Sequence, residues 1–224
     1  MKKAVLMSGG LDSTVILWNV VKEFGAENVV AIYTYFGQRN TEGEKQSFKR
    51  QCEKLGVKNT RSLDLSKIFA DVSMEEETEE GKSTPKGTRK FYNRNLVLIS
   101  SAAAVAMQNG CNTIYHGAHY SDSRGGFVDC TKKFYKAAKK AISVAYPWFT
   151  VEMPLIKKTK EQVVQWGIDA GMTENDFAST WSCYHAPTKE TYEVNGEKFL
   201  KPCGICETCI DRHNGLKNIF PNLM

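Results

Sequence analysis

A short run of small and hydroxyl-bearing residues stands near the amino terminus, where the chain reads "LMSGGLDSTV" from residue 6 to residue 15. Two adjacent glycines, Gly9 and Gly10, allow backbone N–H groups to approach an anion closely. Hydroxyl groups from Ser8, Ser13 and Thr14 supply further hydrogen-bond donors. The N-terminus of a following helix would add a favourable partial charge. The pattern predicts a cradle for phosphate groups.

The loop lacks the spacing that grips a terminal phosphate. Neither G-x-x-x-x-G-K-[ST] nor G-x-G-x-x-G is present. The carboxylate of Asp12 would repel phosphate oxygens unless a divalent cation or the helix dipole offsets its charge, so we expect Mg²⁺ to accompany the nucleotide. The simpler alternative is a tight strand-to-helix turn in which Asp12 only caps the helix. The full string resembles the S-G-G-x-D-S signature of the PP-loop pyrophosphatases, which split ATP into AMP and pyrophosphate. This resemblance predicts ATP contacts from Ser8, Gly9, Gly10, Leu11, Asp12, Ser13 and Thr14.

Four cysteines in the last quarter of the chain have the spacing of a metal site. Cys203, Cys206 and Cys209 form two overlapping C-x-x-C units, and Cys183 lies before a predicted hairpin. Four thiolates satisfy tetrahedral Zn²⁺ and leave no open coordination position, which predicts a structural zinc ion. The alternatives are a disulfide, a redox pair, an iron–sulfur cluster, unrelated buried thiols, or His185 in place of one cysteine.

Strands and helices alternate along the chain and place these motifs. Short apolar runs predict strands at 3–7, 29–35, 60–65, 113–118 and 149–154. Helical spacing predicts helices at 11–24, 41–55 and 95–108, an amphipathic segment at 129–145, and a helix that begins at a Thr159–Gln162 capping box and runs to Gly171. The alternation predicts an α/β fold: a doubly wound, five-stranded parallel sheet of the Rossmann-like PP-loop type.

Two segments interrupt this alternation. Residues 73–90 are polar and offer no apolar face, which predicts a loop or lid. Residues 192–201 alternate around Asn195-Gly196 and predict a β-hairpin. We therefore expect an ATP-binding domain at 1–178 and a small zinc-binding lobe at 179–224 packed on it.

Composition narrows the classes of protein. The chain has 224 residues and a formal charge of +5 with acidic residues interspersed, which suits an anionic small substrate and does not suggest a nucleic-acid coat. No run approaches the roughly 18 apolar residues of a membrane span. The chain has seven cysteines, an odd number, and three of them lie within seven residues near the C-terminus, which favours metal binding in a reducing cytoplasm over disulfides. We expect a cytoplasmic protein that binds neither membrane nor nucleic acid directly.

Several further blocks make the chain similar to the 7-cyano-7-deazaguanine synthases, a PP-loop branch with a four-cysteine zinc site. The similarity runs from the first strand to the last cysteine. Beside the loop it includes "YFGQR" at 35–39, "RNLVLISSAAAVA" at 94–106, "YHGAHYSDSRGGFVDCTKKFYKA" at 115–137, "MPLIKKTKEQVVQWG" at 153–167 and "STWSCY" at 179–184.

The resemblance implies an enzyme that converts 7-carboxy-7-deazaguanine and ammonia to a nitrile while ATP becomes AMP and pyrophosphate. Adenylation activates the acid, ammonia forms the amide, and a second activation allows dehydration. No protein nucleophile is required, so the protein would act by positioning and by stabilising phosphate charge. Small-molecule substrates and a homodimer are implied by the resemblance alone.

Residue roles follow from the matching blocks. Asp12, Arg94 and Asp129 are the expected catalytic residues, and Gln38 and Arg39 are expected to close on the nucleotide. Arg94 could pair with phosphate or a substrate carboxylate, or lie on the surface before a helix. Asp129 or Asp122 could accept hydrogen bonds from a guanine-like base; alternatively, Asp129 caps the following helix. Lys158 and Lys160 are candidate phosphate contacts or solvated loop residues, and His116 and His119 are candidate proton carriers or structural histidines.

Two departures from the family pattern affect the substrate side. Residues 91–95 read "FYNRN" where the family commonly has V-P-x-R-N, and "GGFV" precedes Asp129-Cys130 where Tyr-Pro is usual. An amide product or another acid would follow if these changes reshape the pocket. The rival interpretations are a PP-loop enzyme that modifies transfer RNA, an ammonia-dependent synthetase of the NAD type, and an inactive zinc-stabilised nucleotide-binding protein.

Overall fold

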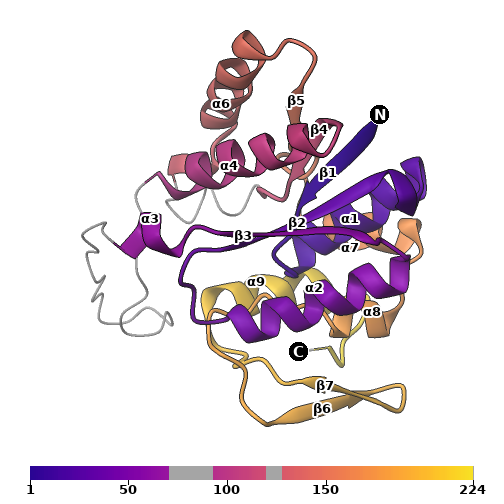
Figure 1. The fold of residues 1–224 in the computed structure, drawn as a ribbon. Helices are drawn as coiled ribbons and strands as arrows, with labels where there is room; N and C mark the ends of the chain where they lie inside the picture. The colour runs from indigo at the N-terminus through magenta and orange to yellow at the C-terminus, as the bar shows by residue number, and fades with distance from the viewer. Residues whose placement is uncertain (71–92, 120–127, 224) are drawn as a thin grey trace.

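A five-stranded parallel sheet forms the centre of the computed structural model, which describes residues 1–70, 93–119 and 128–223. The strands lie in the order β3-β2-β1-β4-β5 (Figure 1). The predicted doubly wound α/β class is confirmed. The bounds of the strands are β1 Lys2–Leu6, β2 Val29–Tyr35, β3 Asn59–Asp64, β4 Cys111–His116 and β5 Thr150–Glu152.

Both faces of the sheet are covered by helices, which is why its central strands are continuously apolar. Along β1, Ala4 and Leu6 pack into a core with α4, while Val5 and the following Met7 pack into a second core with α1 and α7. Figure 1 shows α4 and α6 on one side, and α1, α2, α7 and α9 on the other. The helices are α1 Leu11–Phe24, α2 Thr41–Leu55, α3 Ser66–Ala70, α4 Arg94–Gln108, α6 Lys132–Ala145, α7 Lys160–Ala170, α8 Glu174–Ala178 and α9 Glu207–Leu216, with 3-10 turns at Ala26–Asn28 and Val128–Cys130.

The strand order reverses direction between β1 and β4. The chain moves outward from β1 to β2 and β3, then returns to place β4 on the other side of β1. Ligands of open α/β sheets bind at such a reversal of direction, beyond the carboxyl ends of the strands. Leu6 and His116, which are partners in the β1–β4 register, both lie at this point. Residues 8–14, the predicted phosphate loop, come two residues after the end of β1 at Leu6.

The predicted elements at 11–24, 29–35 and 41–55 match the structure residue for residue, and the other predicted strands and helices differ by one or two residues at an end, except the segment 129–145. The amphipathic segment 129–145 divides into a 3-10 turn and α6, because the Thr131 side chain accepts a hydrogen bond from the Phe134 N–H and starts a new helix. The Thr159–Gln162 capping box is confirmed at the start of α7. The hairpin is also confirmed, as β6 Thr191–Val194 and β7 Glu197–Leu200. The predicted loop or lid at 73–90 lies outside the described residues.

The C-terminal segment shares a core with the sheet domain. Val194 and Phe199 of the hairpin, together with Leu216 and Leu223, are buried in the same cluster as residues of α1 and α7. The segment beyond residue 178 is therefore tied to the sheet domain by apolar contacts. The domain boundary at 178/179 stays a prediction. Within the described ranges, no helix has both the length and the apolar character needed to cross a bilayer.

Gln51 joins three elements through a buried amide, and its loss should cost stability. Its Oε1 accepts from Trp18 Nε1 at 2.7 Å, and its Nε2 donates to Ser179 Oγ at 2.7 Å and to the Asp176 carbonyl at 3.0 Å. We expect Gln51→Met to lower the free energy of unfolding by about 2–4 kcal/mol, because buried polar groups lose their partners. Gln46→Met, an exposed position on the same helix, should change it by less than about 0.5 kcal/mol. Equal losses in urea unfolding would contradict this account.

Candidate functional site

Gly9 fixes the path of the phosphate loop between β1 and α1. Its φ is 85°, in the region that favours glycine, and a Cβ at this position would overlap the backbone oxygen of Glu44 in α2. The Gly9 carbonyl accepts hydrogen bonds from Ser47 Oγ at 2.6 Å and from the Trp181 N–H at 2.9 Å. A larger residue would therefore separate the loop from both supports.

Serine hydroxyls hold the loop from within. Ser13 Oγ accepts from the Ser8 N–H at 3.2 Å and donates to the Gly10 carbonyl at 3.2 Å, and Ser8 Oγ accepts from the Gly10 N–H at 3.3 Å. Ser8 is exposed, whereas Thr14 is fully buried and its hydroxyl has no hydrogen-bond partner among the described residues. The loop is thus shaped before any ligand arrives, with Ser8 facing solvent and Thr14 facing the core.

The segment before Cys183 completes the loop from the far end of the chain. Ser182 Oγ accepts from the Leu11 N–H at 3.1 Å, at the first residue of α1, where an anion would meet the helix dipole. Sequence reasoning did not single out Ser182, Trp181 or Ser47. The signal available was the position of Ser182 directly before a metal-ligand candidate.

Asp12 shares a buried lysine with the C-terminal segment. Lys160 Nζ lies 3.0 and 2.8 Å from the two carboxylate oxygens of Asp12 and 2.8 Å from Asp211 Oδ2. Burial lowers the pKa of Lys160, but the two carboxylates outweigh it and the pKa is raised. Lys160 is therefore a charged residue of the site and not a solvated loop residue. Lys158 instead places its ammonium 5.2 Å from the centre of the Trp166 ring.

Gln38 is held in a buried network beside the loop. Its Nε2 donates to Glu44 Oε2 at 2.8 Å and to the Thr34 carbonyl at 3.1 Å, while its Oε1 accepts from the Phe36 N–H at 2.8 Å. Burial raises the pKa of Glu44 to about 7, although hydrogen bonds from Gln38 and from Tyr33 oppose the shift. Arg39, by contrast, is exposed at the same edge of the sheet.

Arg94 and Asp129 meet at the start of α4. The Arg94 guanidinium lies 5.6 Å from the centre of the Phe36 ring, beyond the end of β2. Asp129 Oδ2 accepts from the Asn95 N–H at 3.3 Å, in the first turn of α4. The alternative that Asp129 caps the following helix is wrong, because Thr131 caps α6. Both residues therefore lie at the start of α4, and Asp122 lies outside the described residues.

The two histidines differ in their partners. His116 Nδ1 accepts from the Ala118 N–H at 3.1 Å, which leaves the proton of the neutral ring on Nε2. Burial and the positive charge of Arg94 lower the pKa of His116 to about 4. Burial also lowers the pKa of His119, which lies among Lys160, Asp12 and Asp211. Both rings are therefore neutral near pH 7.

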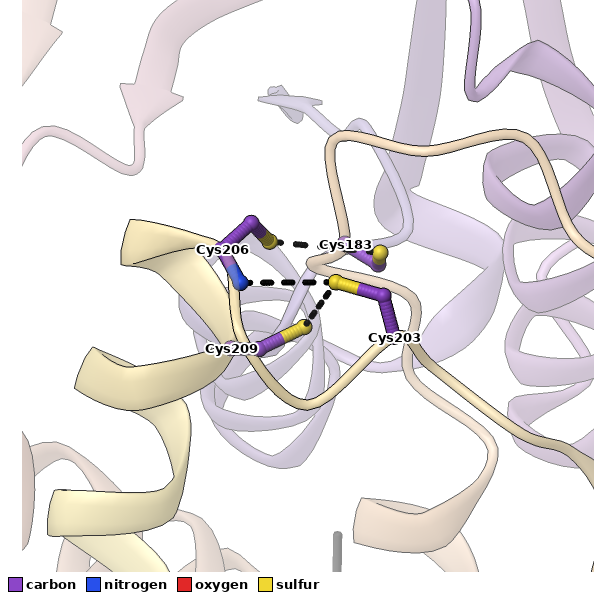
Figure 2. Close-up of side chains that lie close together, drawn as sticks. All are labelled: Cys183, Cys203, Cys206 and Cys209. Carbon is purple, nitrogen blue, oxygen red and sulfur yellow. Dashed lines mark hydrogen bonds between the residues drawn. The ribbon is translucent and has the colours of Figure 1, made fainter. Parts of the chain in front are cut away.

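Four cysteine side chains converge at the N-terminus of α9 (Figure 2). Their sulfur atoms all lie within 4.8 Å of one another, and the pairs Cys203–Cys209 and Cys183–Cys206 are each 3.9 Å apart. A tetrahedron with Zn–S bonds of about 2.3 Å has sulfur atoms about 3.8 Å apart. The set therefore fits one tetrahedral ion, whereas a cubane cluster binds each thiolate to a different iron and needs wider spacing.

The surroundings of the sulfur atoms also suit a cation. The Cys206 N–H donates to Cys203 Sγ at 3.4 Å, and the His185 N–H donates to Cys183 Sγ at 3.3 Å. Such N–H···S bonds stabilise thiolate charge around a metal. All seven cysteines of the chain are free, and His185 contributes its backbone, so the metal-ligand candidates are the four thiols.

Comparison with known proteins places this site in a family. The family model described as "Queuosine biosynthesis protein QueC" matches residues 2–220. The chain belongs to the QueC family. It is 32% identical over 228 residues to the 7-cyano-7-deazaguanine synthase of Caldicellulosiruptor bescii, covering 98% of this chain and 94% of that protein. It is 34% identical over 228 residues to the synthase of Campylobacter concisus, covering 97% and 95%.

Solved structures share the fold of this QueC-family chain at low sequence identity. The ammonia-dependent NAD synthetase of Campylobacter jejuni has a TM-score of 0.51 at 13% identity, over 79% of this chain and 66% of that one. The NMN synthetase of Francisella tularensis has a TM-score of 0.51 at 17% identity, over 79% and 64%. These similarities show the fold alone.

The departures from the family pattern are placed only in part. Tyr92 and Gly126 lie outside the described residues. Asn93, directly before α4, has a φ of 59°, which asparagine tolerates better than most residues. This conformation leads the chain into the helix that begins with Arg94.

The buried Glu44 predicts a pH-dependent stability. A carboxyl pKa raised from 4.5 to about 7 contributes stability that is complete below 4.5 and lost as pH rises through about 7. From pH 5 to 8, the wild type should therefore lose about 2–3 kcal/mol of unfolding free energy relative to Glu44→Gln. Urea unfolding at four pH values measures this. Glu53→Gln, an exposed position on the same helix, should show no such trend, and a pH-independent difference for Glu44→Gln would contradict the assignment.

Proposed function

We propose that this QueC-family chain converts 7-carboxy-7-deazaguanine and ammonia to 7-cyano-7-deazaguanine, with ATP becoming AMP and pyrophosphate. The observation that carries the proposal is the preformed loop at residues 8–14, set at the carboxyl edge of a parallel sheet. The names of relatives that match nearly the whole chain supply the product, 7-cyano-7-deazaguanine, and the substrates are those that the family resemblance implies.

The loop residues would bind the phosphates of ATP. Backbone N–H groups of Gly9, Gly10 and Leu11 and the hydroxyls of Ser8 and Ser13 would contact the phosphates, and Asp12 would hold the accompanying Mg²⁺. Thr14, which faces the core, would support the loop from behind. When bound, Mg²⁺ neutralises charge on the departing pyrophosphate. Arg39 would close on the nucleotide from the end of β2. Gln38 would contribute by holding Glu44 and the β2 edge in place.

The substrate would lie between the loop and α4. Arg94 would pair with the carboxylate of the acid, and Asp129 would accept hydrogen bonds from the donor edge of the base. The carboxylate attacks the α-phosphorus of ATP, pyrophosphate leaves, and ammonia displaces AMP to give the amide. A second ATP adenylates the amide oxygen, and loss of AMP with two amide protons leaves the nitrile. The neutral His116 is a candidate donor and acceptor for these proton transfers.

The four cysteines would hold a structural Zn²⁺ ion, since Cys183, Cys203, Cys206 and Cys209 fill a tetrahedral shell and leave no position for a substrate. Free thiols throughout the chain suit a reducing compartment, so we place the enzyme in the cytoplasm. From the family resemblance we also propose a homodimer that acts on small molecules and does not bind nucleic acid directly.

The activity is tested by mass spectrometry with 7-carboxy-7-deazaguanine, ammonium, Mg²⁺ and ATP. We expect the nitrile together with AMP and pyrophosphate. Gly9→Ala should lower the rate of pyrophosphate release by about 100-fold or more, because the added Cβ displaces the loop from Glu44 and misplaces the phosphates. Gly56→Ala, which has a φ of 70° and open space around it, carries the same backbone strain without the clash and should keep its rate.

Each failure has its own meaning. Accumulation of the amide would point to an amide-forming enzyme and to an altered substrate pocket. ATP binding without pyrophosphate release would support an inactive nucleotide-binding protein. Retention on RNA that falls steeply with salt would favour a transfer-RNA-modifying enzyme.

The zinc assignment is tested by elemental analysis of the purified protein. We expect about one zinc per chain, and Cys203→Ala should abolish stoichiometric binding and lower the apparent stability by several kcal/mol, since a structural zinc site contributes on the order of 10 kcal/mol. Cys52→Ala removes a buried thiol outside the cluster and should retain the metal. Iron with visible absorption would instead indicate an iron–sulfur cluster.

A further inference from the structure

Lys160 has an environment that a simple surface ion pair would not need. Its side chain is only 11% exposed, and its ammonium lies between Asp12 of α1 and Asp211 of α9 at 2.8 Å from each. One cation thus joins the phosphate loop to the C-terminal segment. The two carboxylates come from positions 199 residues apart (211 − 12 = 199).

The surface of α9 is shaped to admit the stem of this lysine. Gly215 lies four residues after Asp211, so both occupy one face of the helix. A Cβ on Gly215 would overlap Lys160 Cγ and approach its Cβ to 3.1 Å. Glycine in a helix interior costs up to about 1 kcal/mol relative to alanine. The missing side chain at Gly215 leaves a slot beside Asp211 on α9, and the stem of Lys160 occupies it. This fit supports the placement of Lys160 independently of the ion pairs.

Two groups of contacts fix the position of α9. Cys206 lies at its N-cap and Cys209 in its first turn, so the cysteine cluster holds the start of the helix. Arg212, only 3% exposed, donates to the Phe177 carbonyl at 2.6 Å and to Thr180 Oγ1. Asp211 is thus held on a helix with little freedom to shift.

We propose that Asp211 is a positioning residue for the nucleotide site: it holds the Lys160 ammonium at the phosphate loop, so that the lysine pairs with the phosphates of Mg·ATP when Asp12 turns to the cation. This inference rests on the proposed use of ATP. An ammonium tied to Asp12 alone would follow that carboxylate. With Asp211 as a second anchor, the ammonium stays in place and pays less entropy to meet the phosphates.

The test is the affinity for Mg·ATP, measured by titration calorimetry on the metal-loaded full chain. Asp211→Asn should weaken binding about tenfold, as expected when one partner of a buried charge pair is removed. Glu207→Gln makes the same charge change at an exposed position of α9 and should leave the affinity within twofold. In a Lys160→Met background, Asp211→Asn should cause no further loss, because its effect acts through the lysine.

A second variant keeps the carboxylate and fills the slot. Gly215→Ala should weaken Mg·ATP binding by a similar factor while metal content is maintained, because the added methyl group displaces the Lys160 stem and leaves both carboxylates in place. Unchanged affinity in both single variants, with only a lower melting temperature, would show a purely structural ion pair and overturn the proposal. So would an equal loss from Asp211→Asn with and without Lys160.

Measurements on the wild-type chain separate the role of Asp211 from the proposed activity. A wild-type chain that binds Mg·ATP but forms no nitrile or pyrophosphate would refute the activity, while the affinities still decide the role of Asp211. A wild-type chain with no affinity for Mg·ATP would overturn both.

Discussion

The carbonyl of Gly9 is the point on which the site depends. It accepts one hydrogen bond from Ser47 in α2 and another from the backbone of Trp181, so one oxygen joins the first loop of the chain to its second helix and to its C-terminal segment. This arrangement requires the loop to lie against α2 so closely that no side chain fits at Gly9. The geometry that we propose for phosphate binding is therefore a result of packing between distant parts of the chain, and not a property of the glycine pair alone.

Buried polar groups surround this point and are held by one another. Glu44 accepts from Tyr33, Gln38 and Asn40, and Asn40 also donates to the carbonyl of Cys183 at 2.9 Å. A half-satisfied network of this kind would be costly, so its completeness fixes the relation between β2, α2 and the cysteine cluster. Hydrogen bonds of Asn40 therefore join the carboxyl edge of the sheet to the segment that carries the cysteines.

The parts of the site that could be predicted are those whose residues lie close together in the sequence. The S-G-G-x-D-S loop and the C-x-x-C-x-x-C run are local patterns, and the continuous apolar runs of β1 and β2 and the spacing of α1 lie within single elements. Helix α9 was missed because its buried residues include Cys209, Arg212 and Gly215, which give no apolar stripe. The pairing of Lys160 with Asp211 and of Leu11 with Ser182 depends on how helices pack, and no spacing along the chain encodes that.

The distance between Leu11 and Ser182, 171 positions along the chain, has a consequence for synthesis. A ribosome makes the loop long before Ser182, Asp211 and the buried Leu223. The loop of a nascent chain therefore lacks these supports until the later residues have been made. Contacts of such high sequence separation also form late in folding, because the long intervening loop must close first. A chain that lacks residues 182–211 would be deficient in ATP use, because Ser182 and Asp211 support the nucleotide site from positions far along the sequence.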